Sequence, residues 1–201
     1  MTSMAPRCVR PGSYLNEKGA AMTNPVRRVV TGHNDAGEAV VLIDGAAPNA
    51  RVRRAAGGLV STLLWVTEES PASIGGVTDR AEREIGVAPP PRGSVFRIVD
   101  FPPLANPGAI DNAAMRRELG LAAPAHSAPR GALHRHPLMH RTKSIDYAVV
   151  LQGEIDMLLD ESEIHLRAGD ALVQQGTNHA WVNRSSAICR IAFVLIDAAE
   201  R

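Results

Sequence analysis

Two stretches of the chain decide its fold: MHRTKSIDYAVVLQG, residues 139–153, and GDALVQQGTNHAWVN, residues 169–183. In each, a polar group with metal-ligand chemistry lies next to an apolar run that is typical of a strand and is bounded by glycine. Together they contain His140, Asp146 and His179, which are two imidazoles and one carboxylate. The two stretches therefore predict a small β fold with a polar interior.

The polar residues of the first stretch follow the period of a strand. If residues 140–151 are extended, His140, Thr142, Ser144 and Asp146 share one face, because alternate side chains of a strand point the same way. A solvent-facing strand more often carries Lys, Arg and Glu than two hydroxyls, an imidazole and a carboxylate. This face is therefore predicted to point into the protein.

The second stretch shows the same alternation. His179 and Trp181 share a face, and Trp181 is expected either to wall a pocket or to belong to the ordinary core. One of Gln174 and Gln175 must point inward for the same reason, and Gln174 is the candidate for the pocket.

Strand patterns recur along the rest of the chain, separated by Gly, Asn, Asp and Pro. They cover residues 26–30, 39–43, 59–67, 94–101, 145–151, 154–159, 163–166, 171–174, 180–182 and 187–196. Residues 145–166 are expected to form a meander with a hairpin turn at 160–162. Short helices are expected at 79–85, from the capping-box pair Asp79 and Glu82, and at 111–119 before Gly120. Many short strands with such turns predict a closed or double-sheet β architecture.

The charge of the chain argues against a nucleic-acid partner. It has 201 residues, with 22 Lys and Arg against 21 Asp and Glu, and a net charge of +1. A nucleic-acid surface needs a broad basic face instead. Arg51, Arg53 and Arg54 do cluster, but beside Pro48 and Asn49, so a solvated loop is favoured over a phosphate site.

Cysteine usage and hydropathy indicate a cytoplasmic location and no membrane partner. Cys8 and Cys189 are far apart and form no CxxC pair, so they do not suggest a disulfide framework. Residues 1–25 contain no apolar segment of a secretory signal. No run approaches the roughly 18 apolar residues of a membrane span.

The chain is expected to form one domain with appendages. Residues 1–25 are predicted to be a disordered extension, and residues 26–105 to supply the N-terminal strands and an arm. Residues 106–133 are predicted to be a linker with a short helix, and residues 130–197 to form the core of the fold.

The two opening stretches resemble the two motifs of the cupin superfamily, in its single-domain, conserved-barrel form. In the first motif, His140 matches the first histidine, Asp146 stands at the glutamate position, and six residues separate it from Gly153. In the second, Gly176, His179 and Asn183 match. The resemblance covers residues 130–197. It implies an all-β, double-stranded β-helix or jelly-roll barrel with one or two short helices and an N-terminal arm.

The resemblance also implies a divalent transition metal (Fe, Mn, Zn or Ni), which cupins hold with three histidines and a glutamate. Here Thr142 replaces the second histidine and Asp146 the glutamate, so His140, Asp146 and His179 would form a reduced, three-ligand set. A metal-free alternative makes the same residues a hydrogen-bonded polar pocket. His134 and His136 form a rival pair, whose default location is the surface or the rim of the pocket.

The expected function is that of a small-molecule enzyme, in which His140, Asp146 and His179 act on a compact organic acid or carbonyl compound. Lyase, decarboxylase, isomerase and dioxygenase chemistry all occur in cupins, and the fold does not choose among them. The alternative is a non-catalytic ligand-binding cupin. No Walker, dinucleotide-binding or GxSxG pattern occurs, so no nucleotide cofactor is expected. Cupins commonly pair, so a homodimer is expected.

Overall fold

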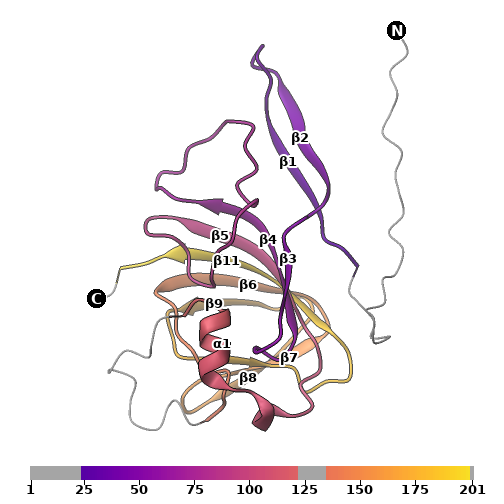
Figure 1. The fold of residues 1–201 in the computed structure, drawn as a ribbon, viewed down its shortest axis with the longest axis vertical. Coiled ribbons are helices and arrows are strands. Elements are labelled where there is room, and N and C mark those ends of the chain that lie inside the picture. Colours follow the sequence, from indigo (N-terminus) through magenta and orange to yellow (C-terminus); the bar gives the residue numbers. More distant parts are fainter. Residues whose placement is uncertain (1–23, 122–134, 200–201) are drawn as a thin grey trace.

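The computed structural model describes residues 24–121 and 135–199 of the chain (Figure 1). The predicted extension at residues 1–25 lies almost entirely outside the described residues, as do His134 and most of the second half of the predicted linker. Within the described part, strands dominate. They are β1 (Arg27–His33), β2 (Ala39–Ala46), β3 (Ala50–Arg53), β4 (Leu59–Thr67), β5 (Ser94–Phe101), β6 (Ser144–Gln152), β7 (Glu154–Leu158), β8 (Glu163–Arg167), β9 (Ala171–Gln175), β10 (Ala180–Val182) and β11 (Cys189–Asp197).

The body of the protein consists of two sheets. The larger has six strands in the order β3-β4-β5-β11-β6-β9, and the smaller has three in the order β10-β7-β8. Every pairing between these strands is antiparallel. The chain thus has the all-β, jelly-roll architecture that the sequence predicts.

The core lies between these sheets. Ile155, Met157 and Trp181 of the smaller sheet pack in one cluster with Val95 and Ile191 of the larger sheet, and each is at most 7% exposed. Removing such side chains from water stabilises the fold by about 1.5–3 kcal/mol each. Along the first part of β5 the side chains alternate, since Val95, Arg97 and Val99 are buried while Phe96 is 40% exposed; Asp100 and Phe101 at its end are both buried.

One short helix closes an end of the body. Helix α1 (Asn112–Glu118) begins after Asp111, whose side chain accepts hydrogen bonds from the backbone N–H groups of Ala113 and Ala114. Its buried Met115 packs in a second cluster with Met139 and Val182. A single 3-10 turn (Pro107–Ala109) precedes it. None of the helices in the described residues is long and apolar enough to span a membrane.

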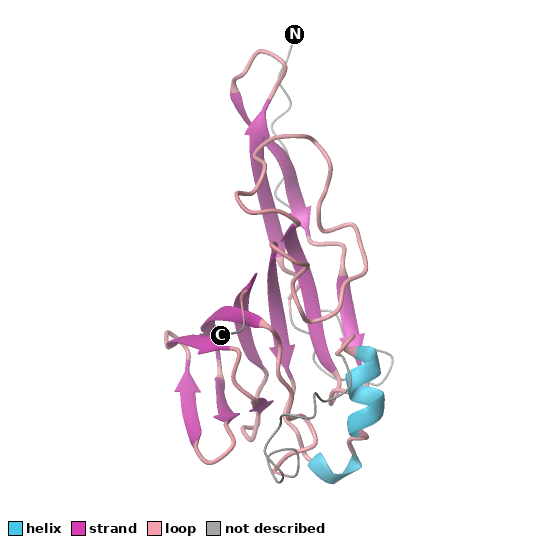
Figure 2. Ribbon diagram, turned by 90° about the vertical axis from the view of Figure 1, so that its left-hand side faces the viewer, coloured by secondary structure: helices cyan, strands magenta, loops and turns pink. Residues whose placement is uncertain are grey.

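Strands β1 and β2 form a separate hairpin that extends away from the two sheets (Figure 2). Buried Arg28 ties it to the body by donating hydrogen bonds to the backbone oxygen of Leu64 and to the carboxylate of Asp79. This hairpin corresponds to the predicted N-terminal arm.

Two sequence predictions were wrong. Residues 79–85 do not form a helix. The Asp79 carboxylate accepts from the N–H of Ala81, as a capping residue does, but the carbonyls of Ala81 and Arg83 accept hydrogen bonds from the Asn49 side chain in place of a helical ladder. Strand β6 also does not continue into a meander with β7, since it pairs with β11 and β9 in the larger sheet. Gly153, at a φ of 75°, carries the chain from one sheet to the other.

Candidate functional site

Two connected cavities lie inside and at the mouth of the body. The inner cavity has a volume of about 80 Å³, and the outer one about 280 Å³. Three side chains line both of them: Arg53, Ser61 and Arg97. The wall of the inner cavity is mostly apolar, and its polar members besides the shared three are His140, Thr142, Asp146 and His179. The predicted set therefore faces one enclosed space.

His140 and His179 are held together by the backbone. They form an isolated antiparallel bridge in which each N–H donates to the other's carbonyl at 2.9 Å. Their ring centroids are 4.5 Å apart. The Nδ1 of His140 lies 2.8 Å from the carbonyl of Leu138, and that of His179 lies 3.0 Å from the carbonyl of Thr177. An Nδ1–H that donates to a carbonyl leaves Nε2 with a free lone pair.

Both imidazoles are neutral at physiological pH. Burial, followed by the neighbouring His140 ring, lowers the pKa of His179 to about 3. Burial also lowers the pKa of His140, against the effect of its bond to Leu138. The pair therefore presents two uncharged imidazoles to the cavity rather than a cation.

Asp146 ends a chain of hydroxyl groups along one face of β6. The hydroxyl of Ser144 donates its proton to the Asp146 carboxylate at 2.5 Å. Because that proton is used, the Ser144 oxygen acts as the acceptor for the hydroxyl of Thr142, at 2.9 Å. All three side chains are at most 5% exposed. Burial raises the pKa of Asp146 to about 6, although the bond from Ser144 and the charge of Arg97 lower it. This carboxyl can exchange a proton near neutral pH.

The predicted metal set is only partly assembled. No group of three or more His, Cys, Asp or Glu side chains in the described residues is arranged to hold a metal ion. Two imidazoles are adjacent, but the Asp146 carboxylate is engaged by Ser144. Catalytic sites usually supply three protein ligands, so the arrangement of the described residues does not fit a resident metal, and the chemistry proposed for the site uses none.

The remaining predicted residues divide between the pocket and its surroundings. Trp181 lines the inner cavity and also belongs to the core, so both of its expected roles apply. Gln174 is buried, and its amide nitrogen donates to the carbonyl of Thr177 at 3.2 Å and lies 3.0 Å from Nδ1 of His179. His136 is buried but lines neither cavity, and burial followed by the charge of Arg184 lowers its pKa.

Arg97 is the functional residue that the sequence reasoning missed. Its side chain is 5% exposed and belongs to β5, and one terminal nitrogen donates to the carbonyls of Gly86 and Val87. Its Nε is buried with no hydrogen-bond partner among the described residues. Burial, followed by the charge of Arg53, lowers the pKa of Arg97 to about 10, so it remains a cation at neutral pH. The alternation along residues 94–101, which places an arginine between two valines, was the available signal.

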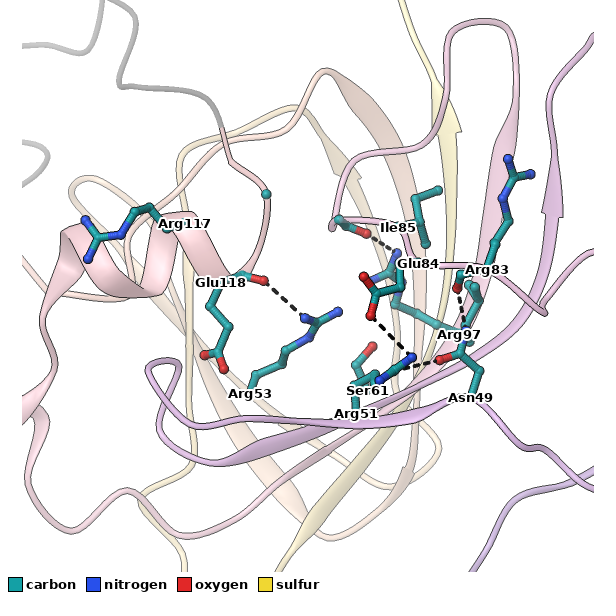
Figure 3. Close-up of a pocket in the computed structure, with 13 residues that line it drawn as sticks. Asn49, Arg51, Arg53, Ser61, Arg83, Glu84, Ile85, Arg97, Arg117 and Glu118 are labelled. Carbon is teal, nitrogen blue, oxygen red and sulfur yellow. Dashed lines mark hydrogen bonds and ion pairs between the residues drawn. The ribbon is translucent and has the colours of Figure 1, made fainter.

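The arginine cluster at residues 51–54 needs a correction. Arg51 and Arg53 lie on strand β3 rather than in a loop, and both line the outer cavity (Figure 3). Arg53 donates to the backbone carbonyl of Glu118 at 3.1 Å, while the Glu118 carboxylate accepts from the N–H groups of Arg54 and Ala55. The cluster was predicted to be a solvated loop because Pro48, Asn49 and the nearby glycines gave no indication of a strand.

Comparison with known proteins agrees with this architecture. A sequence profile described as Cupin domain matches residues 125–196. The chain is 34% identical to phomopsin biosynthesis cluster protein C′ of Diaporthe leptostromiformis over 191 residues, covering 91% of this chain and 84% of that protein. It is 28% identical to the cupin-domain-containing oxidoreductase srdD of Neurospora crassa, covering 98% of this chain and 88% of that protein.

Among solved structures, a Salmonella typhimurium protein described as ethanolamine utilization protein q superposes with a TM-score of 0.43 at 11% identity. That alignment covers 87% of this chain and 98% of that one. The two motifs, the two packed sheets and the sequence relatives lead to one assignment. The chain belongs to the cupin superfamily.

Proposed function

We propose that this cupin is an enzyme of small-molecule metabolism that binds a compact organic acid or carbonyl compound in its inner cavity and transfers a proton there. The observation that carries the proposal is the shared lining of that cavity: Asp146, His140 and His179 face one narrow, mainly apolar space. A proton-transfer group with a pKa near the working pH, placed beside a cavity that can hold a substrate, is what general acid–base catalysis requires.

Asp146 is assigned the role of acid and base. Its raised pKa, about 6, gives both protonation states near neutral pH. The carboxylate takes a proton from a carbon next to a carbonyl, the C–H electron pair moves toward the carbonyl oxygen, and the proton later returns. Such a step is common to isomerases, lyases and some decarboxylases, so the product depends on the substrate.

The histidines are assigned to orientation. With Nδ1–H of His140 donating to the Leu138 carbonyl, its Nε2 accepts a hydrogen bond from a substrate hydroxyl or enol. Nδ1 of His179 lies 3.0 Å from both the Thr177 carbonyl and the Gln174 amide nitrogen, so its tautomer sets whether its Nε2 accepts or donates. Thr142 lines the same cavity and is fixed through Ser144. None of these roles uses a metal.

The printed names of the relatives support an enzymatic role in biosynthesis. Two are phomopsin biosynthesis cluster proteins, and three are named cupin-domain-containing oxidoreductases. The rival function, ligand binding without chemistry, is supported by the incomplete ligand set alone.

A proton-exchange experiment tests the proposal. Pyruvate and phenylpyruvate are incubated with the protein in D₂O, and the loss of the C3 proton signals, next to the ketone, is followed by NMR. Exchange of the C3 protons, the only enolisable C–H groups of these keto acids, should exceed the background rate, and Asp146→Asn should reduce it by about 10²-fold or more, the usual contribution of a general base. Saturable binding of both acids without enzyme-dependent exchange would instead support the ligand-binding function.

The expected homodimer remains part of the proposal. Phe96, Val194, Tyr147 and Val173 lie opposite one another across β5, β11, β6 and β9. Three of them are 40–62% exposed, on the face of the sheet away from the core. A second copy would cover this apolar row. Tyr147→Lys should shift sedimentation from dimer to monomer, while Ile74→Lys, on an exposed loop residue, should not.

A further inference from the structure

The junction of the two cavities carries two arginines with no anionic partner in the described part of the chain. Arg53 of β3 and Arg97 of β5 both line the inner and the outer cavity. Among the described residues neither forms an ion pair, and both donate to neutral backbone carbonyls. Two cations that repel each other are stable in a partly buried place only if something compensates them.

The carboxylates nearest to Arg53 and Arg97 bind other groups. The Glu118 carboxylate accepts two backbone N–H groups of the turn after β3, at 3.0 and 2.7 Å. The Glu84 carboxylate pairs with Arg51 at 3.3 Å and its side chain is 85% exposed. Asp146 acts on Arg97 only from a distance, with no ion pair between them in the described residues. The junction therefore keeps a net positive charge.

The junction also carries hydrogen-bond donors that are free to bind a ligand. The buried Nε of Arg97 has no acceptor in the described residues, and the hydroxyl of Ser61 lines both cavities. Figure 3 shows Arg53, Ser61 and Arg97 extending from the strands toward the middle of the outer cavity. A guanidinium with unused N–H groups matches the two oxygens of a carboxylate.

We propose that Arg97, with Arg53 and Ser61, binds the carboxylate of a small organic acid whose apolar body extends into the inner cavity toward His140 and His179. This inference rests on the proposed function and names its substrate class. The inner wall contains Phe101, Trp181 and Phe193, so it accepts an apolar or aromatic body. The mainly apolar lining of the inner cavity favours a monocarboxylate with an apolar body over a small, fully polar anion such as inorganic phosphate.

The test is a binding measurement on the full chain. Benzoate and pyruvate are titrated calorimetrically, with benzamide as the neutral analogue of benzoate and inorganic phosphate as the competing anion. Benzoate should bind at least about tenfold more tightly than benzamide, because the charge-assisted bonds are lost with the amide. Arg97→Met should weaken benzoate binding by about tenfold or more.

The matched control removes the same charge at the rim. Arg117 is exposed and lines only the outer cavity, so Arg117→Met should change benzoate binding by less than about twofold. Arg53→Met provides a second test, since Arg53 is only half-buried and its loss threatens folding less. Circular dichroism and urea unfolding establish that each variant is folded.

The outcomes separate this inference from the proposed function. Equal binding of benzoate and benzamide, tighter binding of phosphate, or equal losses in Arg97→Met and Arg117→Met would overturn it. Asp146→Asn should retain benzoate binding while losing proton exchange. Failure of exchange with intact, Arg97-dependent benzoate binding would contradict the catalytic role alone.

Discussion

His140 and His179 exchange a reciprocal pair of backbone hydrogen bonds at 2.9 Å, and this bridge places their imidazole rings 4.5 Å apart. Nδ1 of each ring lies within hydrogen-bonding distance of the carbonyl two residues before it in the chain. The two cupin motifs therefore meet through main-chain atoms, and the geometry of the pair does not depend on a metal to hold it.

Because His179 is buried as a neutral ring, we expect the stability of the fold to decrease in acid. Its pKa is about 3 in the folded protein and near 6.5 when unfolded, so the unfolded chain binds more protons below about pH 6.5 and stability falls as pH falls. His179→Gln should make this decline shallower by up to about 1.4 kcal/mol per pH unit. Urea unfolding from pH 4.5 to 7 measures the slope, and identical slopes in both proteins would contradict the buried neutral ring.

The contribution of Asp146 to the stability of the fold should have the opposite pH dependence. Its folded pKa is raised to about 6 from 3.8, so the folded protein binds more protons between these values and stability is lost as pH rises through about 6. Asp146→Asn should leave stability unchanged below about pH 4 and raise it above pH 7 by up to about 3 kcal/mol. The same unfolding series tests this, and a variant less stable than the parent at pH 8 would be inconsistent with it.

Metal analysis tests the ligand set. Because the described residues present two imidazoles without a third protein ligand, protein purified without chelator should contain less than about a tenth of an equivalent of transition metal. Elemental analysis by mass spectrometry measures this. A stoichiometric metal that is lost in both His140→Ala and His179→Ala would restore the three-ligand interpretation.

Gly153 should tolerate no side chain. Its φ is 75°, and an added Cβ would lie 2.7 Å from the carbonyl oxygen of Ile188. Gly153→Ala should destabilise the protein by about 2 kcal/mol or more, through strain and the clash. Gly37 provides the control, since its φ is 78° and nothing lies within 4 Å of the added atom, so Gly37→Ala should cost only about 1 kcal/mol. Equal thermal shifts in the two variants would show that the close approach is unimportant.

The sequence predicted strands and faces well where alternation is unambiguous. Strands β4, β5 and β10 have the predicted bounds, and the inward face of Thr142, Ser144 and Asp146 is buried as expected. These successes share a cause, because a period of two fixes which side chains meet the core once a strand forms.

The sequence could not show which strands pair or which distant residues share a cavity. Residues 145–166 were expected to form a meander because they are adjacent in the chain, but β6 pairs with β11. Arg53 and Arg97 are 44 positions apart and meet only because β3, β4 and β5 are neighbours in the sheet. Spacing within one stretch carries no information about such contacts.

Strand β11 hydrogen-bonds to β5 on one side and to β6 on the other. It thereby joins a first half that supplies the arginines to a second half that supplies the histidines and the aspartate. If the arginines select the substrate and the histidines and the aspartate act on it, these two tasks are encoded in separate parts of one gene. Exchanging the first half between relatives is then a route to new substrate preferences with the reacting groups left intact.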